Sequence, residues 1–352
     1  MKRHITDVKR VIFLCIFVFT CFSVKGNDLA AEERLQEEIQ DKYPAAAIMP
    51  PEKEYEEYKV DYLENFEVRG SFDLQQGFDN NVDLDSKRHK DGFLQAIGDL
   101  EVAYKMSEEL KLKAGGDMFT ILYYKYNSNN IFDIEPYVGF DYEIIPGLVS
   151  INRCSYDYFS YPNSHESTFS AIELSTALRH YLTEDLYHSL GYEYSHRWYA
   201  DWKVSMEDSR KGDNDREDNR NTITHKIRFF FEQLILKLNN ELIFVDSNHK
   251  YQDYYDSWKY SVKPGIMYFL TDQLYTDISF RYKHTNYKNR RSSEDVNKKV
   301  RDNTYTLSAA LYYDLTKNMT LEVSYSYSEN DSNDPFNKYS GSIVSGGIYY
   351  SF

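Results

Sequence analysis

Cysteine and long apolar segments are scarce in this sequence, and basic residues are fewer than acidic ones, 41 against 56. Only three of its 352 residues are cysteine. Cys15 and Cys21 lie in an N-terminal segment that we expect to be removed, so Cys154 is left alone and an intramolecular disulfide is excluded. Beyond that segment no stretch approaches the roughly twenty apolar residues of a membrane-spanning helix. The mean hydropathy of −0.66 excludes a bundle of such helices.

The shortage of positive charge excludes a further class of partner. The formal net charge is −15. Residues 1–26 hold five basic residues and one acidic residue, about +4, so the remainder carries about −19. Such acidity is unfavourable for binding nucleic acid. The sequence also has no phosphate-binding glycine loop and no paired-cysteine metal motif, so we expect no cofactor.

The N-terminus has the residue order of a secretory signal peptide. Four basic residues among residues 2–10 precede an apolar run from Val11 to about Phe22, and small or polar residues follow before Asn27. We therefore expect residues 1–26 to be a cleaved signal peptide. A lipoprotein acylated on Cys21 is the alternative, but the preceding Val18-Phe19-Thr20 lacks the small residues that such a cysteine usually follows.

Residues 27–60 differ from the rest of the mature chain. They combine an acidic segment with helical periodicity, the Pro50-Pro51 break and a charged stretch after it. Their charge predicts a solvated segment, either an acidic periplasmic tail or a plug.

Aromatic residues are abundant, with 34 Tyr and 21 Phe. A membrane β-barrel places aromatic residues in belts at both membrane interfaces, whereas a soluble domain can bury only some of them. A barrel also explains the low hydropathy, because only every second residue of a membrane strand faces lipid.

From residue 61 onwards the sequence alternates between apolar and polar residues. Phe72 and Leu74 share one face of the first such segment, and Arg69 and Asp73 share the other. The pattern recurs to the C-terminus and predicts a transmembrane antiparallel up-and-down β-barrel over 61–352, with about 14 strands and a range of 12–16. We place strands at 65–78, 92–104, 110–124, 131–144, 148–161, 168–181, 186–200, 222–231, 234–248, 257–270, 274–288, 302–313, 319–328 and 339–352, with 110–124, 148–161 and 223–236 ambiguous in phase.

The expected connections alternate in length. Those after even-numbered strands are tight, as in Ile145-Pro146-Gly147 and Thr271-Asp272-Gln273, whereas those after odd-numbered strands, such as 79–91 and 201–221, are mostly longer and polar. Short turns on one side and long loops on the other are typical of outer-membrane barrels. A soluble β-sandwich has no reason to sort its loops in this way.

Three segments resemble parts of known families. The final Ile348, Tyr350 and Phe352 resemble the terminal strand of bacterial outer-membrane proteins, which implies that the barrel assembly machinery reads them as an assembly signal. The segment Gly77–Val82 and the segment Asp331–Phe336 resemble a porin-like barrel family that includes the barrel domain of the surface lipoprotein assembly modifier. That resemblance covers the barrel and implies an outer-membrane location in a Gram-negative cell.

The polar face of the strands supplies the candidate site. Charges of both signs projecting into one pore create a transverse field that selects among polar solutes. The alternative is that the same charges pair across the lumen and fill it. The predicted pore-lining residues are Arg69, Asp73, Arg153, Asp157, Arg179, Glu193, Arg197, Arg228, Asp277 and Arg281.

Other site types have weaker support. Asp213, Asp215, Glu217 and Asp218 suggest a calcium loop but lack the required glycine, so we expect a solvated loop. His188 and His196 share a strand face at about 26 Å and cannot bind one metal ion. No spacing of Ser, His and Asp identifies a catalytic triad, and we predict no enzyme.

The function that fits these features is a porin-like outer-membrane channel for small hydrophilic solutes. An outer-membrane translocon or assembly factor for surface proteins, and an outer-membrane hydrolase, are the alternatives. The expected partners are outer-membrane lipid and lipopolysaccharide, the barrel assembly machinery and the solutes themselves.

Overall fold

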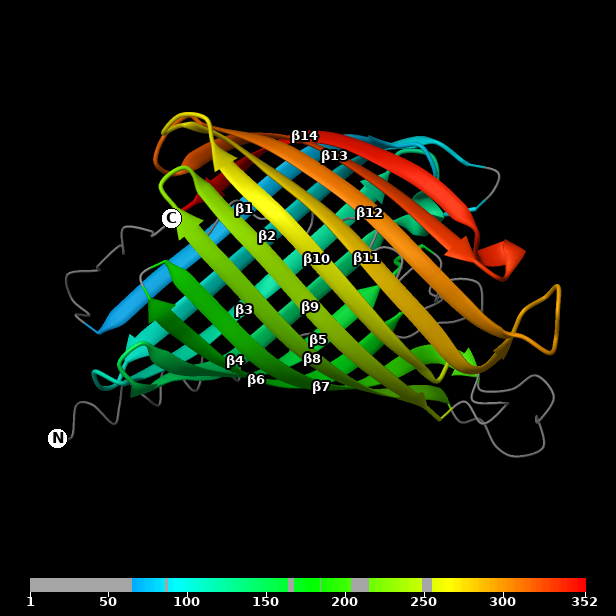
Figure 1. Cartoon of the computed structure of the whole chain (residues 1–352), viewed down its shortest axis with the longest axis horizontal. Coiled ribbons are helices and arrows are strands. Elements are labelled where there is room, and N and C mark those ends of the chain that lie inside the picture. Colours follow the sequence, from blue (N-terminus) through cyan, green and yellow to red (C-terminus); the bar gives the residue numbers. More distant parts are fainter. Residues whose placement is uncertain (1–64, 86–87, 164–167, 184, 204–214, 249–254) are drawn as a thin grey trace.

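The chain forms a closed antiparallel β-barrel in the computed structural model (Figure 1). The structure describes residues 65–352 apart from 86–87, 164–167, 184, 204–214 and 249–254. Within these residues fourteen strands follow one another around the cylinder in chain order, and β1 pairs with β14 to close it. The predicted fold class and strand number are confirmed. The predicted signal peptide and the 27–60 tail lie outside the described residues.

The strands are long for a soluble sheet and run obliquely across the cylinder. Their bounds are β1 Phe66–Asp79, β2 Asp91–Lys105, β3 Leu110–Tyr123, β4 Ile131–Ile145, β5 Leu148–Ser160, β6 Phe169–Thr183, β7 Leu186–Lys203, β8 Asp215–Phe231, β9 Leu234–Ser247, β10 Ser257–Phe269, β11 Leu274–Arg291, β12 Lys299–Asp314, β13 Met319–Ser332 and β14 Tyr339–Ser351. Two 3₁₀ turns, η1 Asn127–Asn129 and η2 Pro335–Asn337, lie between strands. No helix among the described residues is long and apolar enough to span a membrane.

The alternation of side chains separates an apolar outer wall from a polar inner wall. Phe72 is 43% exposed and its register partner Tyr350 is 44% exposed, whereas the next pair, Asp73 and Tyr349, is buried. Residues directly opposite in an antiparallel ladder point to the same side, so one parity of every strand faces outward. The predicted division into a lipid-facing and a wet face therefore holds around the cylinder.

Aromatic side chains form a belt near each end of the outer wall. At the end with short turns the exposed rings are Tyr142, Phe229, Phe231, Tyr268, Tyr313, Tyr350 and Phe352. At the end with long loops they are Phe78, Tyr124, Trp198, Phe244, Trp258, Tyr305 and Tyr327. Two such belts flanking an apolar band are the signature of a membrane barrel, in which the long loops are extracellular.

The tight turns lie where the sequence predicts them. In the β4–β5 turn, Pro146 precedes Gly147, which has φ +82°. This backbone conformation favours glycine, and proline followed by glycine is the usual sequence of a type II turn. The backbone N–H of Tyr181 donates to the carbonyl oxygen of Gly147 at 3.0 Å, which connects this turn to the end of β6.

Several strands are longer than predicted at the extracellular end. β8 begins at Asp215 instead of 222, β13 ends at Ser332 instead of 328, and the β11–β12 hairpin extends to Arg291 and Lys299. Apart from the buried Val300, these extensions consist of polar residues without apolar alternation. Above the membrane a ladder needs only its backbone hydrogen bonds, so hydrophobic periodicity gives no signal there.

Candidate channel lumen

All ten predicted pore-lining residues lie on the inner face. Asp73 and Asp277 are buried on the lumen side of β1 and β11. Arg228 is the register partner of the buried Tyr187 and of Lys237. Arg197 is the register partner of the buried Asp218 and Ala171. Register partners point to the same side of the sheet, so both arginines face inward. The remaining six have the same parity as the buried residues of their strands, namely Arg69, Arg153, Asp157, Arg179, Glu193 and Arg281. Their role as a pore lining stays a prediction.

The ion pairs of the inner wall run along the wall. Arg153 Nη2 lies 2.7 Å from Asp117 Oδ2 and 2.8 Å from Glu135 Oε1, which connects β5 to β3 and β4. Its guanidinium also lies 3.8 Å from the centroid of the Tyr137 ring. This is a dense local cluster on neighbouring strands.

The same pattern holds on the other side of the barrel. Lys237 on β9 pairs with Asp277 on β11, and Arg281 on β11 lies 3.6 Å from Glu241 on β9. Apart from Arg216 and Asp218, which are both on β8, the ion pairs that we identify between described inner-wall side chains join strands that are adjacent or two apart. These pairs lie along the wall and do not cross the lumen.

Acidic and basic side chains occupy different sides of the inner wall. On β1–β4 the charged inner residues at mid-height are mainly acidic, namely Asp73, Asp99, Glu101, Asp117, Asp133 and Glu135. On β8–β11 they are mainly basic, namely Arg220, Lys226, Arg228, Lys237, Lys259, Lys263, Arg281 and Lys283. Strands seven places apart in a ring of fourteen are opposite, so the acidic side faces the basic side.

A third part of the inner wall is lined by hydroxyl groups. Thr306 and Ser328 form a hydrogen bond of 3.0 Å, and Ser324 and Ser345 form one of 2.7 Å. These residues lie on β12, β13 and β14 and continue to Gln75 on β1, whose Oε1 accepts from Ser345 at 2.8 Å. This wall is mainly lined by hydroxyl groups, although it includes the buried acids Asp302 on β12 and Glu322 on β13.

Several inner-wall atoms have no hydrogen-bond partner in the protein. Five of these atoms, all of them buried, are Asp73 Oδ1, Asp157 Oδ1, Arg153 Nε, Arg179 Nε and Arg228 Nε. Buried polar atoms are almost always satisfied by protein or by water. These five atoms are therefore positions where ordered water would complete the hydrogen bonding of the inner wall.

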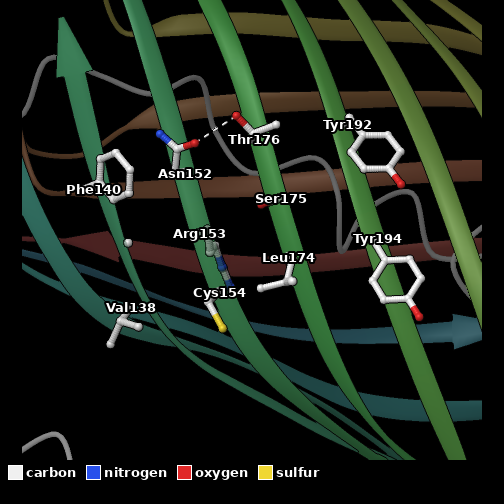
Figure 2. Close-up of a pocket in the computed structure, with 11 residues that line it drawn as sticks. Val138, Phe140, Asn152, Arg153, Cys154, Leu174, Ser175, Thr176, Tyr192 and Tyr194 are labelled. Carbon is white, nitrogen blue, oxygen red and sulfur yellow. Dashed lines mark hydrogen bonds between the residues drawn. The ribbon is translucent and has the colours of Figure 1, made fainter.

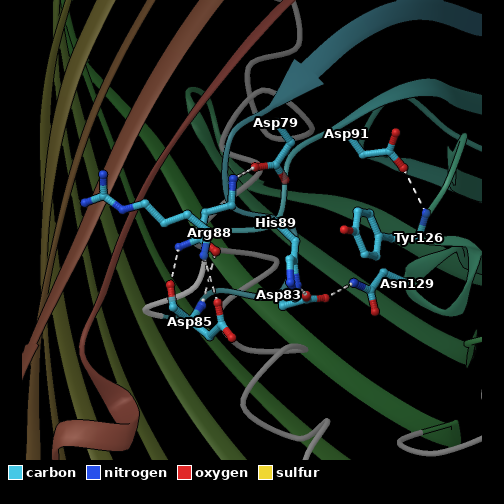
Figure 3. A network of polar contacts seen from close by, with 9 residues as sticks. Asp79, Asp83, Asp85, Arg88, His89, Asp91, Tyr126 and Asn129 are labelled. Atoms are coloured by element: carbon cyan, nitrogen blue, oxygen red, sulfur yellow. Dashed lines mark hydrogen bonds and ion pairs between the residues drawn. The ribbon is translucent and has the colours of Figure 1, made fainter.

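The β1–β2 loop folds against the extracellular mouth (Figure 3). His89 Nδ1 contacts the carboxylate of Asp83, and the second oxygen of this carboxylate accepts from Asn129 Nδ2 at 2.7 Å. The His89 ring stacks on Tyr126 at 5.1 Å. These contacts join the loop to the β3–β4 connection and so fix its position at the mouth.

The same loop contains backbone strain. Leu84 and Arg88 have φ of +48° and +56°, which are conformations that residues other than glycine rarely adopt. Asp85 Oδ1 accepts from the Arg88 backbone N–H at 3.0 Å, and Arg88 Nη2 donates to Ser340 Oγ at 2.6 Å. The contact of Arg88 with Ser340 at the start of β14 stabilises this strained loop conformation. This contact lies beside the β1–β14 seam that closes the barrel.

The mouth also contains an apolar cluster that the sequence prediction missed. Phe93, Ile121, Ile131, Tyr161 and Ile343 are buried together on the inner side. Their strands have apolar residues on both faces near this end, so alternation alone could not assign them.

A groove of about 600 Å³ lies on the outer wall, not in the lumen (Figure 2). It crosses β4–β7, between Val138 and Phe140 on one side and Tyr192 and Tyr194 on the other. Thr176 Oγ1 donates to Asn152 Oδ1 at 2.9 Å inside it. Because its polar groups are few and its walls face lipid, it is no route for a hydrophilic solute.

The residues considered for metal binding or hydrolysis are dispersed. Glu217 faces outward opposite Trp198, whereas Asp218 faces inward and pairs with Arg216, so these two cannot form the suggested calcium loop. Asp213 lies outside the described residues. His188 and His196 both lie on the outer face of β7, which confirms their shared side. Among the described residues no group of His, Cys, Asp and Glu has metal-binding geometry.

A model of one protein family matches the C-terminal part of the chain. Residues 255–352 match the family model described as "Putative beta-barrel porin 2". The match spans β10–β14, including the hydroxyl-lined wall. This C-terminal part of the chain is therefore similar to porin-like barrels, and the two aromatic belts place the barrel in a membrane.

Similar solved structures are outer-membrane proteins. The anion-selective porin from Comamonas acidovorans has 10% identity over 82% of this chain and 99% of that chain, with a TM-score of 0.48. The outer membrane channel DcaP of Acinetobacter baumannii has 12% identity over 82% and 98%, with a TM-score of 0.49. OmpT, an outer membrane protein of Vibrio cholerae, has 10% identity over 85% and 100%, with a TM-score of 0.47. No curated protein matches the chain. At these identities the likeness carries no information on the solute.

Proposed function

We propose that this barrel is a channel through which small hydrophilic solutes cross the outer membrane. The observation that carries the proposal is the opposition of an acidic inner wall on β1–β4 and a basic inner wall on β8–β11. Opposed walls of unlike charge create a field across the lumen. Such a field orients dipolar solutes. The acidic wall attracts cations and the basic wall attracts anions.

The arrangement of ion pairs supports an open path. Pairs that run along the wall, such as Arg153 with Asp117, leave the axis of the cylinder to water. The buried atoms without protein partners are positions for ordered water within the wall.

Uptake by liposomes tests the proposal with uncharged solutes. The purified, refolded full chain is reconstituted into vesicles, which are then exposed to sugars of increasing size. We expect swelling with small sugars and a sharp loss of swelling as the size of the sugar increases. Vesicles that contain the folded barrel but swell no faster than empty vesicles would show that the lumen does not conduct.

The charged walls predict opposite effects of two neutralising substitutions. Lys263→Gln removes charge from the basic wall and should shift ion preference toward cations, whereas Asp117→Asn removes charge from the acidic wall and should shift it toward anions. The reversal potential in a salt gradient measures both. Leu307→Val, on the outer face, is the control. Shifts of the same sign in the two variants would contradict a field across the lumen.

The finer kinship with the barrel domain of the surface lipoprotein assembly modifier is part of this proposal. Its support is local. Asn80 and Asn81, in the first resembling segment, donate to Ser342 Oγ and to the Ser340 carbonyl oxygen, so they contact the start of β14. The second segment includes η2, where Phe336 N donates to Asp334 Oδ1 at 3.4 Å. Delivery of a reporter lipoprotein to the surface of cells with and without this chain tests whether the kinship extends to activity.

A further inference from the structure

The outer wall of β7–β8 has a polar constellation at the level of the extracellular aromatic belt. Asn219 Oδ1 accepts from the Tyr194 hydroxyl at 2.7 Å and from His196 Nδ1 at 2.9 Å. The His196 ring lies 4.5 Å from the Trp198 ring. Glu217 Oε2 lies 3.7 Å from His196 Nε2, so the chain itself places an anion beside this histidine.

The outer wall of β11–β12 repeats this constellation. Asn303 Oδ1 accepts from the Tyr282 hydroxyl at 2.9 Å and from His284 Nδ1 at 2.9 Å. The His284 ring lies 5.3 Å from the Trp258 ring. The tyrosine and histidine are again two residues apart on one strand, and the asparagine is again the register partner of the histidine.

The two constellations differ in one charge. Glu217 lies two residues before Asn219, and the equivalent position two residues before Asn303 is Arg301. Arg301 is exposed and forms no ion pair with another residue in the described part of the chain. The β11–β12 constellation therefore has a cation where the β7–β8 constellation has its internal anion.

The surroundings of Arg301 add positive charge. Arg291 and Lys299 are register partners at the top of the same hairpin and are exposed. The acidic neighbour opposite Asn303 is Asp331, which lies 3.7 Å from Lys338 Nζ. A second acid on β13, Glu329, accepts from the Tyr327 hydroxyl at 3.0 Å. The local excess of charge is positive, whereas the β7–β8 constellation has Glu217 and, opposite Asn219, Asp246.

The height of the constellation points to a lipid headgroup. Trp258 and Tyr305 belong to the extracellular aromatic belt, which lies at the boundary between acyl chains and headgroups. His284 and Asn303 lie one outward row above Tyr282 and Tyr305, and Arg301 lies one row higher still. Groups at this level of the outer wall meet the headgroups of the outer leaflet.

We propose that Arg301, Asn303 and His284, flanked by Trp258, bind a phosphate group of an outer-leaflet lipid. A guanidinium matches two phosphate oxygens with parallel hydrogen bonds. Asn303 Oδ1 accepts hydrogen bonds from Tyr282 and His284, so the Nδ2 of Asn303 donates to the phosphate. His284 Nδ1–H donates to Asn303 Oδ1, so the ring binds the anion in its imidazolium form, in which Nε2–H is the second donor. This β11–β12 phosphate site is independent of conduction through the lumen.

Lipid retention on the full-length, refolded protein tests the site. Native mass spectrometry in detergent measures binding of bisphosphorylated lipid A and of the same lipid without its phosphates. Arg301→Glu, which gives β11–β12 the charge of the β7–β8 constellation, should weaken binding of the phosphorylated lipid by about tenfold or more, since charge-assisted hydrogen bonds are lost. Arg301→Gln is a milder variant whose folding is less at risk, and it should weaken binding in the same direction. The folded state of each variant is verified by its heat-dependent migration on gels.

Two further variants serve as controls. Lys298→Glu reverses an exposed extracellular cation outside the site and should leave retention unchanged. Glu217→Arg gives the β7–β8 constellation the charge of its counterpart and should add a second bound lipid. Equal losses in Arg301→Glu and Lys298→Glu, or equal retention of the lipid without phosphates, would overturn the proposal. If inorganic phosphate binds as tightly as the phosphorylated lipid, free phosphate is the ligand and the lipid assignment is wrong.

Discussion

Arg153 makes two ion pairs and one cation–π contact on the inner wall. It contacts Asp117 and Glu135 and covers the ring of Tyr137, whose hydroxyl donates to Glu101 at 2.7 Å. One guanidinium thus balances two carboxylates on neighbouring strands. Removing it leaves two acids close together in a partly buried setting, which is more unfavourable than losing one exposed pair.

Arg153→Met should therefore destabilise the barrel by about 1–3 kcal/mol, because the hydrogen bonds of a charged group are lost and its partners remain. Urea unfolding in detergent micelles measures the change. Lys298→Met, which removes an exposed pair with Asp295, is the matched control and should change stability by less than about 0.5 kcal/mol. Equal effects would show that the inner-wall cluster contributes no more than a surface pair.

At the scale of single elements, Gly147 shows how closely the turn chemistry fits the fold. Its φ of +82° is unfavourable for a residue with a Cβ, although an added Cβ would meet only the Tyr181 carbonyl oxygen, at 3.5 Å. Gly147→Ala should destabilise the β4–β5 hairpin by about 1 kcal/mol through backbone strain alone. Gly346→Ala, on a strand and with ordinary contact distances, should have a smaller effect. Unfolding of the two variants side by side distinguishes strain from crowding.

The strands were largely predictable from sequence, and the reasons for the exceptions are physical. Where lipid touches one face and water the other, alternation is strong, as in β12 and β13, and the predicted register face is the observed one. In β3 and β5 the inner face also contains apolar residues, such as Ile121 and Phe159, which pack at the mouth. Two apolar faces remove the alternation, and this explains why the phase of these segments was ambiguous.

The sequence predicts which side chains face the lumen, but not how the acidic and basic ones are distributed around it. Parity alone places Asp73, Arg153 and Arg228 on the inner wall, and the same rule identifies Glu135 and Lys263, which the prediction omitted. The opposition of acidic and basic walls requires knowing which strands face each other across a closed ring. That depends on the strand number and on closure, which periodicity leaves uncertain.

Closure itself makes a prediction for the β1–β14 seam. Leu74 and Ile348 are register partners on the outer face, and Gly70 and Phe352 exchange backbone hydrogen bonds of 3.0 Å. In a Cys154→Ser background, Leu74→Cys with Ile348→Cys should form an intramolecular disulfide, since partners in an antiparallel ladder are within reach. Leu74→Cys with Val344→Cys, displaced along β14, should not. Similar crosslinking of both pairs would indicate the loose seam that the translocon alternative requires.

At the scale of the whole molecule, the barrel combines an apolar outer wall with an inner wall divided into acidic, basic and hydroxyl-lined parts. The outer wall fixes the position of the barrel in the membrane through its aromatic belts. The charged and hydroxyl-bearing side chains of the inner wall determine which solutes pass. The same alternation of side chains produces both, so a transmembrane position and a polar interior are consequences of one sequence pattern.

The segment 27–60 is expected to modify conduction if it acts as a plug. Deleting it, with the signal peptide retained for export, should then raise the conductance of each channel without changing its ion preference, because the charged inner wall is intact. Single-channel recording of the shortened and full chains measures this. An unchanged conductance would indicate that the segment is a periplasmic tail.

The most direct test of the central claim is a planar-bilayer recording of the purified, refolded full chain. A hydrated lumen with charges held along its wall predicts discrete conductance steps, and an ion preference that shifts with substitutions on the inner wall but not on the outer wall. A membrane that contains the folded barrel and stays electrically sealed would contradict the account.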